Sequence, residues 1–145
     1  MGWADDCEAI RQTISLYCQL LDDQRYDEMG RLFALDAVMF WQGTTTTGRD
    51  QIVAGMPATQ LPLGTSRHLP YGPVIRIEAD TASVWTDVMV TVHPADAPAF
   101  PGWVGRYHQH FTRADGRWFI AAHIALGIGD AIPDGVEIVD SRTLG

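Results

Sequence analysis

The second half of the chain is dominated by strand-like segments that are separated by turn signals. Four such segments, rich in Val, Ile, Thr and aromatic residues, cover residues 67–78, 82–93, 103–113 and 117–127. Asp115-Gly116 separates the last two, and an Asp-Gly pair between strand-forming residues is a strong signal for a two-residue hairpin. Because hairpins join antiparallel neighbours, this half of the chain predicts an antiparallel sheet.

The first half of the chain predicts helices. Ile10, Ile14 and Leu21 recur at helical spacing, which predicts an amphipathic helix over about 6–22 with Asp5 as the start of a capping box. The other elements expected before residue 67 are a helix over 26–36, a strand over 37–41, a polar turn at Thr44 to Thr47, and a helix from Gly48 to about Met56. Helices followed by a run of hairpins favour an α+β fold with the helices on one face of the sheet.

Length and charge restrict the class of protein. The chain has 145 residues, 18 acidic against 10 scattered basic side chains, and a formal net charge of −8, which disfavours binding to nucleic acid or anionic membranes. We expect one domain over residues 1–128 and an irregular tail over 129–145. The sequence has neither a membrane-spanning apolar run nor a signal-peptide pattern near its start, so we expect a cytoplasmic protein.

Neither cysteine is expected to form a disulfide within the chain. Cys7 and Cys18 fall in one predicted helix, where their separation corresponds to about 16 Å of rise, which is beyond the reach of a disulfide. We expect two free, buried thiols.

The last hairpin carries three histidines whose predicted face depends on its register. A regular two-residue turn places Phe111 opposite Ile120 on the inner face, and His108 opposite His123 on the outer face, with His110 beside them. Three such histidines can converge on zinc or iron. Since no carboxylate nearby in the sequence completes the set, we favour a solvated or subunit-interface cluster and expect no metal.

Several short motifs follow one another in a familiar order. They are Tyr17-x-x-x-Leu21-Asp22-x-x-x-Tyr26-Asp27, Gly48-Arg49-Asp50, Ser66-Arg67-His68 and Gly105-Arg106-Tyr107. Over residues 8–126 the sequence resembles the SnoaL-like branch of the nuclear transport factor two superfamily. The resemblance implies a cone: a strongly bent antiparallel sheet, wrapped by three N-terminal helices, with an apolar pocket inside.

The resemblance also implies a catalytic pair. Asp22 and His68 stand where scytalone dehydratase and the hexachlorocyclohexane dehydrochlorinase carry an Asp-His base dyad, and Tyr17 matches the oxyanion-stabilising tyrosine of ketosteroid isomerase. In such a dyad a neutral imidazole takes a proton, while the carboxylate fixes its tautomer. The implied function is a cofactor-independent lyase or isomerase that acts on a small, apolar, cyclic molecule. The residues alone favour a structural interpretation, in which Asp22 is a turn former and His68 a hydrogen-bonded histidine at the start of a strand.

Further side chains are expected to face the implied pocket and contact substrate. They are Phe33, Trp41, Tyr107, Gln109 and Phe111. Trp41 and Tyr107 stand where scytalone dehydratase has a tyrosine and an asparagine, so the same substrate is not expected.

A second resemblance leaves a non-catalytic function open. The segment Leu20-Leu21-Asp22-Asp23-x-Arg25-Tyr26-Asp27-Glu28 is similar to the start of ring-hydroxylating dioxygenase β subunits, which share the cone fold and are mainly structural. In that case the chain would be a ligand-binding or structural module. In either case the superfamily resemblance implies a homo-oligomer, a dimer or trimer, that packs through the outer face of the sheet.

Overall fold

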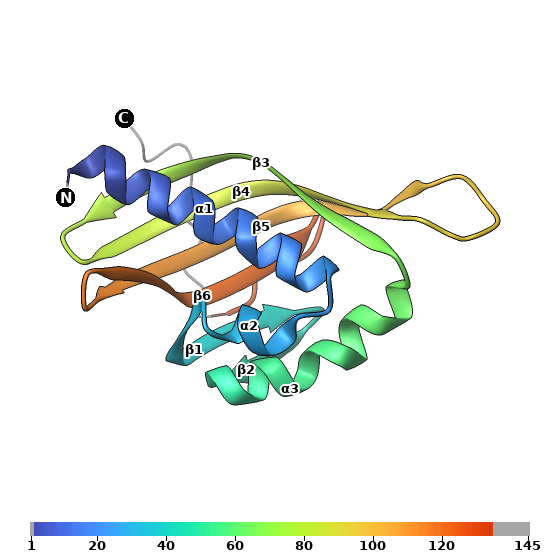
Figure 1. Ribbon diagram of the computed structural model, residues 1–145, viewed down its shortest axis with the longest axis horizontal. Helices are drawn as coiled ribbons and strands as arrows, with labels where there is room; N and C mark the ends of the chain where they lie inside the picture. The colour runs from blue at the N-terminus through green and yellow to red at the C-terminus, as the bar shows by residue number, and fades with distance from the viewer. Residues whose placement is uncertain (1, 135–145) are drawn as a thin grey trace.

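The computed structural model describes residues 2–134, which form helices in the first half of the chain and long strands in the second (Figure 1). The elements are α1 (Trp3–Asp22), α2 (Tyr26–Gly30), β1 (Phe33–Trp41), β2 (Thr44–Thr47), α3 (Arg49–Gln60), a short 3-10 turn (Leu61–Leu63), β3 (Ser66–Glu78), β4 (Thr81–Val92), β5 (Phe100–Ala114) and β6 (Arg117–Gly127). Most of the tail predicted over 129–145 lies outside the described residues.

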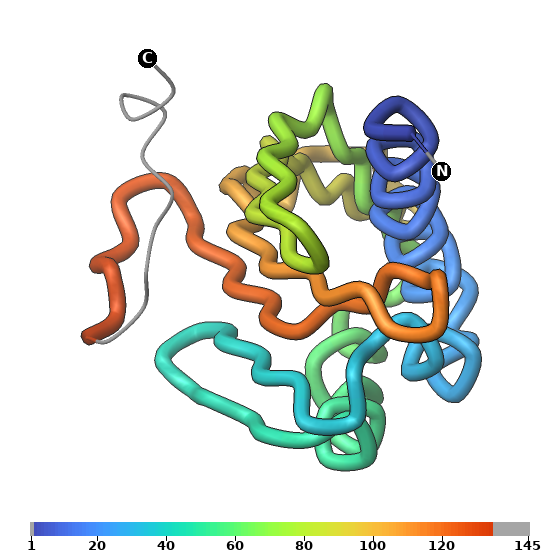
Figure 2. Tube along the Cα trace, turned by 90° about the vertical axis from the view of Figure 1, so that its left-hand side faces the viewer, coloured from blue at the N-terminus to red at the C-terminus, as the bar shows by residue number. Residues whose placement is uncertain are grey.

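The six strands form one curled sheet in the order β2-β1-β6-β5-β4-β3. Figure 2 shows the sheet curving round, with α1 and α3 on the same side of it. The predicted α+β cone with three N-terminal helices is confirmed. One strand pair differs from a fully antiparallel sheet: β1 runs parallel to β6. These two strands are far apart in the sequence and are not joined by a hairpin.

The β5–β6 turn has the predicted conformation. Asp115 and Gly116 both adopt positive φ, at 50° and 72°, as a two-residue type I′ turn requires, and Arg113 pairs with Trp118 as expected. The predicted register is wrong beyond the first few residues. Phe111 still pairs with Ile120, but His110 pairs with Ala122.

Ala121 is therefore an extra residue on β6, a β-bulge without its own partner on β5. A one-residue insertion reverses the faces of everything beyond it, since side chains alternate along a strand. His123 consequently lies opposite Gln109, not His108, and on the inner face of the sheet, not the outer one.

Helix α1 begins at Trp3, earlier than predicted, and the Asp5 carboxylate accepts a hydrogen bond from the Gly2 N–H at 3.0 Å. The helix ends in a Schellman turn. Gln24 takes a left-handed φ of 58°, and the Arg25 N–H donates to the Leu20 carbonyl at 2.9 Å. This turn fixes Asp22 as the last residue of the helix.

Three boundaries in the first half differ from the predictions. The second helix ends at Gly30 and β1 already begins at Phe33, whose carbonyl accepts a hydrogen bond from Arg49 Nε at 2.9 Å. Thr44 to Thr47 form strand β2 and not a turn, because these β-branched residues pair with β1. Helix α3 continues past Pro57 to Gln60.

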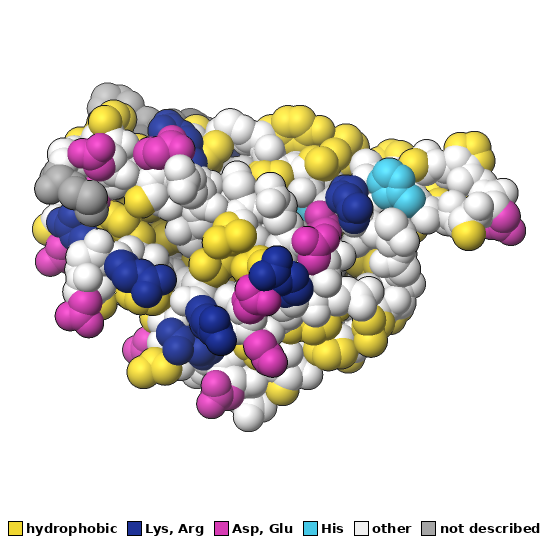
Figure 3. All heavy atoms as spheres, in the orientation of Figure 1, with side chains coloured by type: hydrophobic (Ala, Val, Ile, Leu, Met, Phe, Trp, Pro, Cys, Tyr) yellow, Lys and Arg dark blue, Asp and Glu magenta, His cyan; other side chains and the backbone are white. Residues whose placement is uncertain are grey.

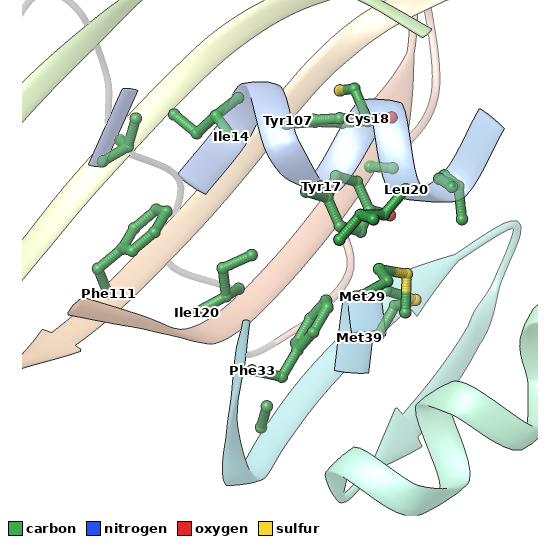
Figure 4. Close-up of a cluster of buried hydrophobic side chains, with 14 of the residues drawn as sticks. Ile14, Tyr17, Cys18, Leu20, Met29, Phe33, Met39, Tyr107, Phe111 and Ile120 are labelled. Carbon is green, nitrogen blue, oxygen red and sulfur yellow. The ribbon is translucent and has the colours of Figure 1, made fainter. Parts of the chain in front are cut away.

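The core lies between α1 and the concave face of the sheet. Figure 4 shows Tyr17 from α1 near Phe33 and Met39 from β1. Cys7 and Cys18 are free and buried, as predicted. At the far end of α1, the buried Asp6 carboxylate accepts hydrogen bonds from Trp118 Nε1 at 2.8 Å and from Arg113 Nη1 at 3.1 Å, which joins the helix to the β5–β6 hairpin.

Acidic and basic side chains lie next to one another on the face shown in Figure 3, with hydrophobic side chains between them. This face does not present the continuous basic patch that nucleic-acid binding requires. None of the helices in the described range combines the length and apolar character needed to cross a membrane.

Candidate active site

A cavity of about 430 Å³ opens between α1, α3 and the concave face of the sheet. Most of its lining is apolar or aromatic. The lining residues are Tyr17, Leu21, Met39, Trp41, Gln42, Thr44, Thr46, Ile52, Gly55, Met56, Thr59, Gln60, Leu63, His68, Val90, Val92, Gly102, Trp103, Tyr107, His123 and Ala125. A few polar groups converging in an apolar cavity are typical of a small-molecule site.

Asp22 and His68 meet at the wall of this cavity. The Asp22 Oδ1 and His68 Nδ1 atoms lie 2.6 Å apart, and each side chain is 5% exposed. Both carboxylate oxygens also accept the backbone N–H of His68, at 3.1 and 3.0 Å. Strand β3 is an edge strand, so this N–H has no strand partner, and Asp22 satisfies it.

The ring of His68 has one nitrogen free for chemistry. Its Nδ1 is engaged by Asp22, and His68 lines the cavity. A neutral imidazole whose Nδ1–H donates to a carboxylate carries its lone pair on Nε2. The arrangement can therefore accept a proton from a molecule in the cavity and stabilise the imidazolium that results.

Two tyrosines add phenol groups to the same cavity. Tyr17 from α1 and Tyr107 from β5 are both buried, and their rings pack edge to face with centroids 6.0 Å apart. Burial, aided by the nearby Asp22 carboxylate, raises the pKa of both phenols. Both therefore stay protonated at neutral pH and can donate a hydrogen bond.

His123 is the site residue that the sequence misplaced. It is 2% exposed, and its Nδ1 lies 3.0 Å from Gln109 Nε2. Burial, with a smaller repulsion from His68, lowers the pKa of His123 to about 3, so the ring is neutral at physiological pH. The cavity thus holds two histidines with different partners.

An aromatic wall completes the cavity. Trp41 and Trp103 pack with ring centroids 5.5 Å apart, and Trp103 lies 6.1 Å from Tyr107. Flat aromatic surfaces of this kind suit a ring-shaped ligand. The sequence interpretation included Trp41 and Tyr107 but missed Trp103.

Of the predicted substrate contacts, Trp41 and Tyr107 lie in the cavity lining, but three others do not. Phe33 and Phe111 are buried in the hydrophobic core and do not line the cavity. Gln109 reaches the site only through His123.

The outer-face histidine cluster does not form. His108 and His110 lie on the opposite face of β5 from Gln109, and the β6 bulge moves His123 to the inside. Among residues 2–134, no group of three or more His, Cys, Asp or Glu side chains is placed to hold a metal.

Helix α3 supplies part of the lining that the sequence interpretation also missed. Ile52, Met56 and Thr59 face the cavity from successive turns of the helix. The sequence shows that these three residues recur at helical spacing, but Pro57 led us to predict that the helix ends at about Met56. For His123, the local signal of a bulge was weak and consisted of the pair of small residues Ala121-Ala122 just before it.

Fold and site together define a cone-shaped α+β domain with a largely apolar cavity and an Asp-His pair at its wall. The chain belongs to the SnoaL-like domain family, whose family model matches residues 4–123. No curated protein matches the sequence at a significant level.

Solved structures show the same fold at low sequence identity. A nuclear transport factor two-like protein with a cystatin-like fold is 21% identical, with a TM-score of 0.81 over 88% of this chain and 85% of that chain. A candidate scytalone dehydratase is 19% identical, with a TM-score of 0.77 over 93% and 97%. A candidate aromatic ring hydroxylase is 21% identical, with a TM-score of 0.77 over 90% and 94%. All three come from Novosphingobium aromaticivorans.

Proposed function

We propose that this protein is a cofactor-independent acid-base enzyme that takes a proton from a small, largely apolar ring compound. His68 is the general base, and Asp22 orients it. The observation that carries the proposal is the 2.6 Å contact between Asp22 Oδ1 and His68 Nδ1 at the cavity wall. The carboxylate holds the proton on Nδ1, leaving the Nε2 lone pair to act as the base.

Removal of a proton from a carbon atom leaves a carbanion, and the reaction class depends on what happens to that carbanion. Tyr17 and Tyr107, kept protonated by burial, would donate to a developing oxyanion or to a leaving group. Loss of water or halide would make the protein a lyase, and return of the proton to another carbon would make it an isomerase. Attack of the carbanion on an electrophilic carbon of the same molecule would make it a cyclase. A base, a donor and a largely apolar cavity suffice for these reactions, so we propose that no cofactor takes part. The similarity of fold to a candidate scytalone dehydratase favours the lyase.

One observation favours a second function. Asp22 also satisfies the backbone N–H of His68 and so joins α1 to β3, which is a structural role. A non-catalytic ligand-binding or structural module, similar to a ring-hydroxylating dioxygenase β subunit, would need only that role.

A substrate screen followed by substitution separates the two functions. Cyclic hydroxyketones and halogenated ring compounds are screened for base-dependent loss of water or halide. On any compound turned over, H68A and D22N should each lower kcat/KM by about two to four orders of magnitude. The control T45V, which removes a hydroxyl from an exposed position of β2 outside the cavity lining, should stay within about twofold of wild type. Unchanged turnover in both dyad variants overturns the assignment, and ligand retention without turnover supports the binding module.

A further inference from the structure

His123 lies inside the cavity although the proposed base and the two tyrosines do not require it. Its ring packs between the phenols, with centroids 4.9 Å from Tyr17 and 4.4 Å from Tyr107. Placing a polar ring among aromatic side chains costs free energy unless its nitrogen atoms have partners. One of the two ring nitrogens has such a partner in the protein.

That partner selects the tautomer of His123. Gln109 Nε2 is an amide nitrogen that can only donate, and it lies 3.0 Å from His123 Nδ1. Nδ1 therefore accepts, and a neutral ring must carry its proton on Nε2. Both residues are almost fully buried, at 1% and 2% exposure, so water does not compete for this hydrogen bond.

The two cavity histidines are thus arranged for opposite tasks. His68 has a carboxylate at Nδ1, which favours a proton there and a lone pair on Nε2. His123 has an amide donor at Nδ1, which favours a proton on Nε2. Burial and the neighbouring His68 lower the pKa of His123, so it does not compete for the proton that His68 takes.

We infer that His123 is a further catalytic residue, a neutral hydrogen-bond donor whose Nε2–H binds an oxygen atom of the substrate, and that Gln109 is the residue that positions it. The inference rests on the proposed function of His68 as the base. When His68 Nε2 takes a proton from a carbon next to a carbonyl, the C–H electron pair becomes the C=C bond of an enolate. The carbonyl π pair moves to the oxygen, and the His123 hydrogen bond to that oxygen becomes stronger as its charge grows.

This arrangement restricts the substrate class. A compound with a carbonyl or similar oxygen acceptor pairs with the His123 N–H, whereas a ring without one leaves this buried donor unpaired. The cavity should therefore favour an oxygenated ring compound over a hydrocarbon of the same shape.

A matched pair of probes measures this preference. The ketone 1-indanone and the hydrocarbon indane share one ring skeleton and differ at the carbonyl. We expect the wild-type protein to bind 1-indanone about tenfold more tightly, as one buried hydrogen bond provides. H123F keeps a ring of similar size without the N–H and should reduce the ratio to about one. The control T45V, an exposed position of β2 outside the cavity lining, should retain it.

The role of Gln109 has its own measurement, which a purely structural role would not affect. Nitrogen-15 NMR of the free wild-type protein should show His123 protonated on Nε2 and not on Nδ1. In Q109E a carboxylate replaces the donor, so the proton should move to Nδ1 and the indanone preference should be lost although His123 is present. Q109L removes the partner and should give a mixture of tautomers.

The outcomes separate this inference from the proposed function. A wild-type tautomer with the proton on Nδ1, equal affinity for the two probes, or an unchanged ratio in H123F overturns the role of His123. H68A should keep the indanone preference, because it leaves the donor intact. If H68A retains turnover while the His123 measurements agree with expectation, only the proposed base is wrong.

Discussion

Asp22 holds His68 at two points, its ring and its backbone. The carboxylate engages Nδ1 at 2.6 Å and accepts the peptide N–H with both oxygens at 3.1 and 3.0 Å. The backbone contact fixes where β3 lies against the end of α1, and the ring contact fixes the orientation of the imidazole. One carboxylate thus sets both the position and the tautomer of the proposed base.

Replacing this carboxylate by an amide should impair the tautomer more than the fold. In D22N the amide nitrogen can donate to His68 Nδ1, which would shift the ring proton to Nε2 and remove the lone pair from the cavity. We expect kcat to fall at least about a hundredfold with little change in KM. Nitrogen-15 NMR of His68 checks the tautomer directly.

The neighbouring substitution D23N is the matched control, because Asp23 is exposed and makes no contact with His68. It should leave both the His68 tautomer and kcat unchanged. An unaltered tautomer in D22N would contradict this account of the pair.

Protonation of His123 should link stability to pH. Its pKa is about 3 in the folded protein and about 6.5 in the unfolded chain. Between these values only the unfolded chain binds the proton, so the unfolding free energy falls as pH is lowered from 6.5 toward 3. One such group contributes about 1.4 kcal/mol per pH unit.

Denaturant unfolding of wild type and H123F at pH 7, 6, 5 and 4 measures this contribution. The slope of H123F between pH 6 and 4 should be shallower by about that amount. Burial also lowers the pKa of His108, which supplies a slope of the same sign in both proteins. Identical slopes would show that His123 is not buried in a neutral form.

The Asp6 carboxylate should stabilise the fold without affecting the site. It accepts hydrogen bonds from Trp118 and Arg113 at the end of α1 remote from Asp22. Because D6A leaves the buried Trp118 N–H unpaired, we expect Tm to fall by about 5 °C or more. Calorimetry checks the shift, and affinity for 1-indanone should be unchanged at a temperature where the variant is folded. D5A, which removes only an exposed contact to Gly2, should have a smaller effect.

Gly105 should not tolerate a side chain. A Cβ at this position would overlap the Leu126 carbonyl and lie 2.5 Å from the ring of Trp103, a cavity-wall residue. G105A should therefore destabilise the protein by about 2 kcal/mol and change the tryptophan fluorescence. Gly55 lies in helix α3, where an added Cβ would meet no atom of a neighbouring element within 4 Å. G55A should therefore leave the free energy of unfolding unchanged or increase it. Equal stability of G105A and wild type would mean that the strands and Trp103 readjust freely.

Much of the fold was predictable because its signals are local. The spacing of Ile10, Ile14 and Leu21 predicts α1, and Asp115-Gly116 predicts the last hairpin and the register next to it. The threonine strand β2 was missed although its pairing is also local, with Trp41 opposite Thr44 across the two-residue turn Gln42-Gly43. Four threonines in a row lack the alternation of apolar and polar residues that marks a half-buried strand.

The candidate site divides in the same manner. The order of the motifs identified Asp22 and His68 as candidate site residues. Their contact joins residues 46 positions apart, and it exists only because the end of α1 lies against the edge strand β3. Trp103 lies in the cavity wall because the sheet curls, and no local sequence pattern specifies that curl.

The sequence by itself determined the first helix, the long hairpins of the second half and the residues that resemble a base dyad. The tertiary structure alone decided which face of β6 meets the cavity. Side chains on a strand alternate, so the extra residue Ala121 turned His123 from the expected outer cluster to the inside, opposite Gln109. A bulge leaves almost no trace in the hydrophobic pattern, because it arises from how two strands pair and not from either strand alone.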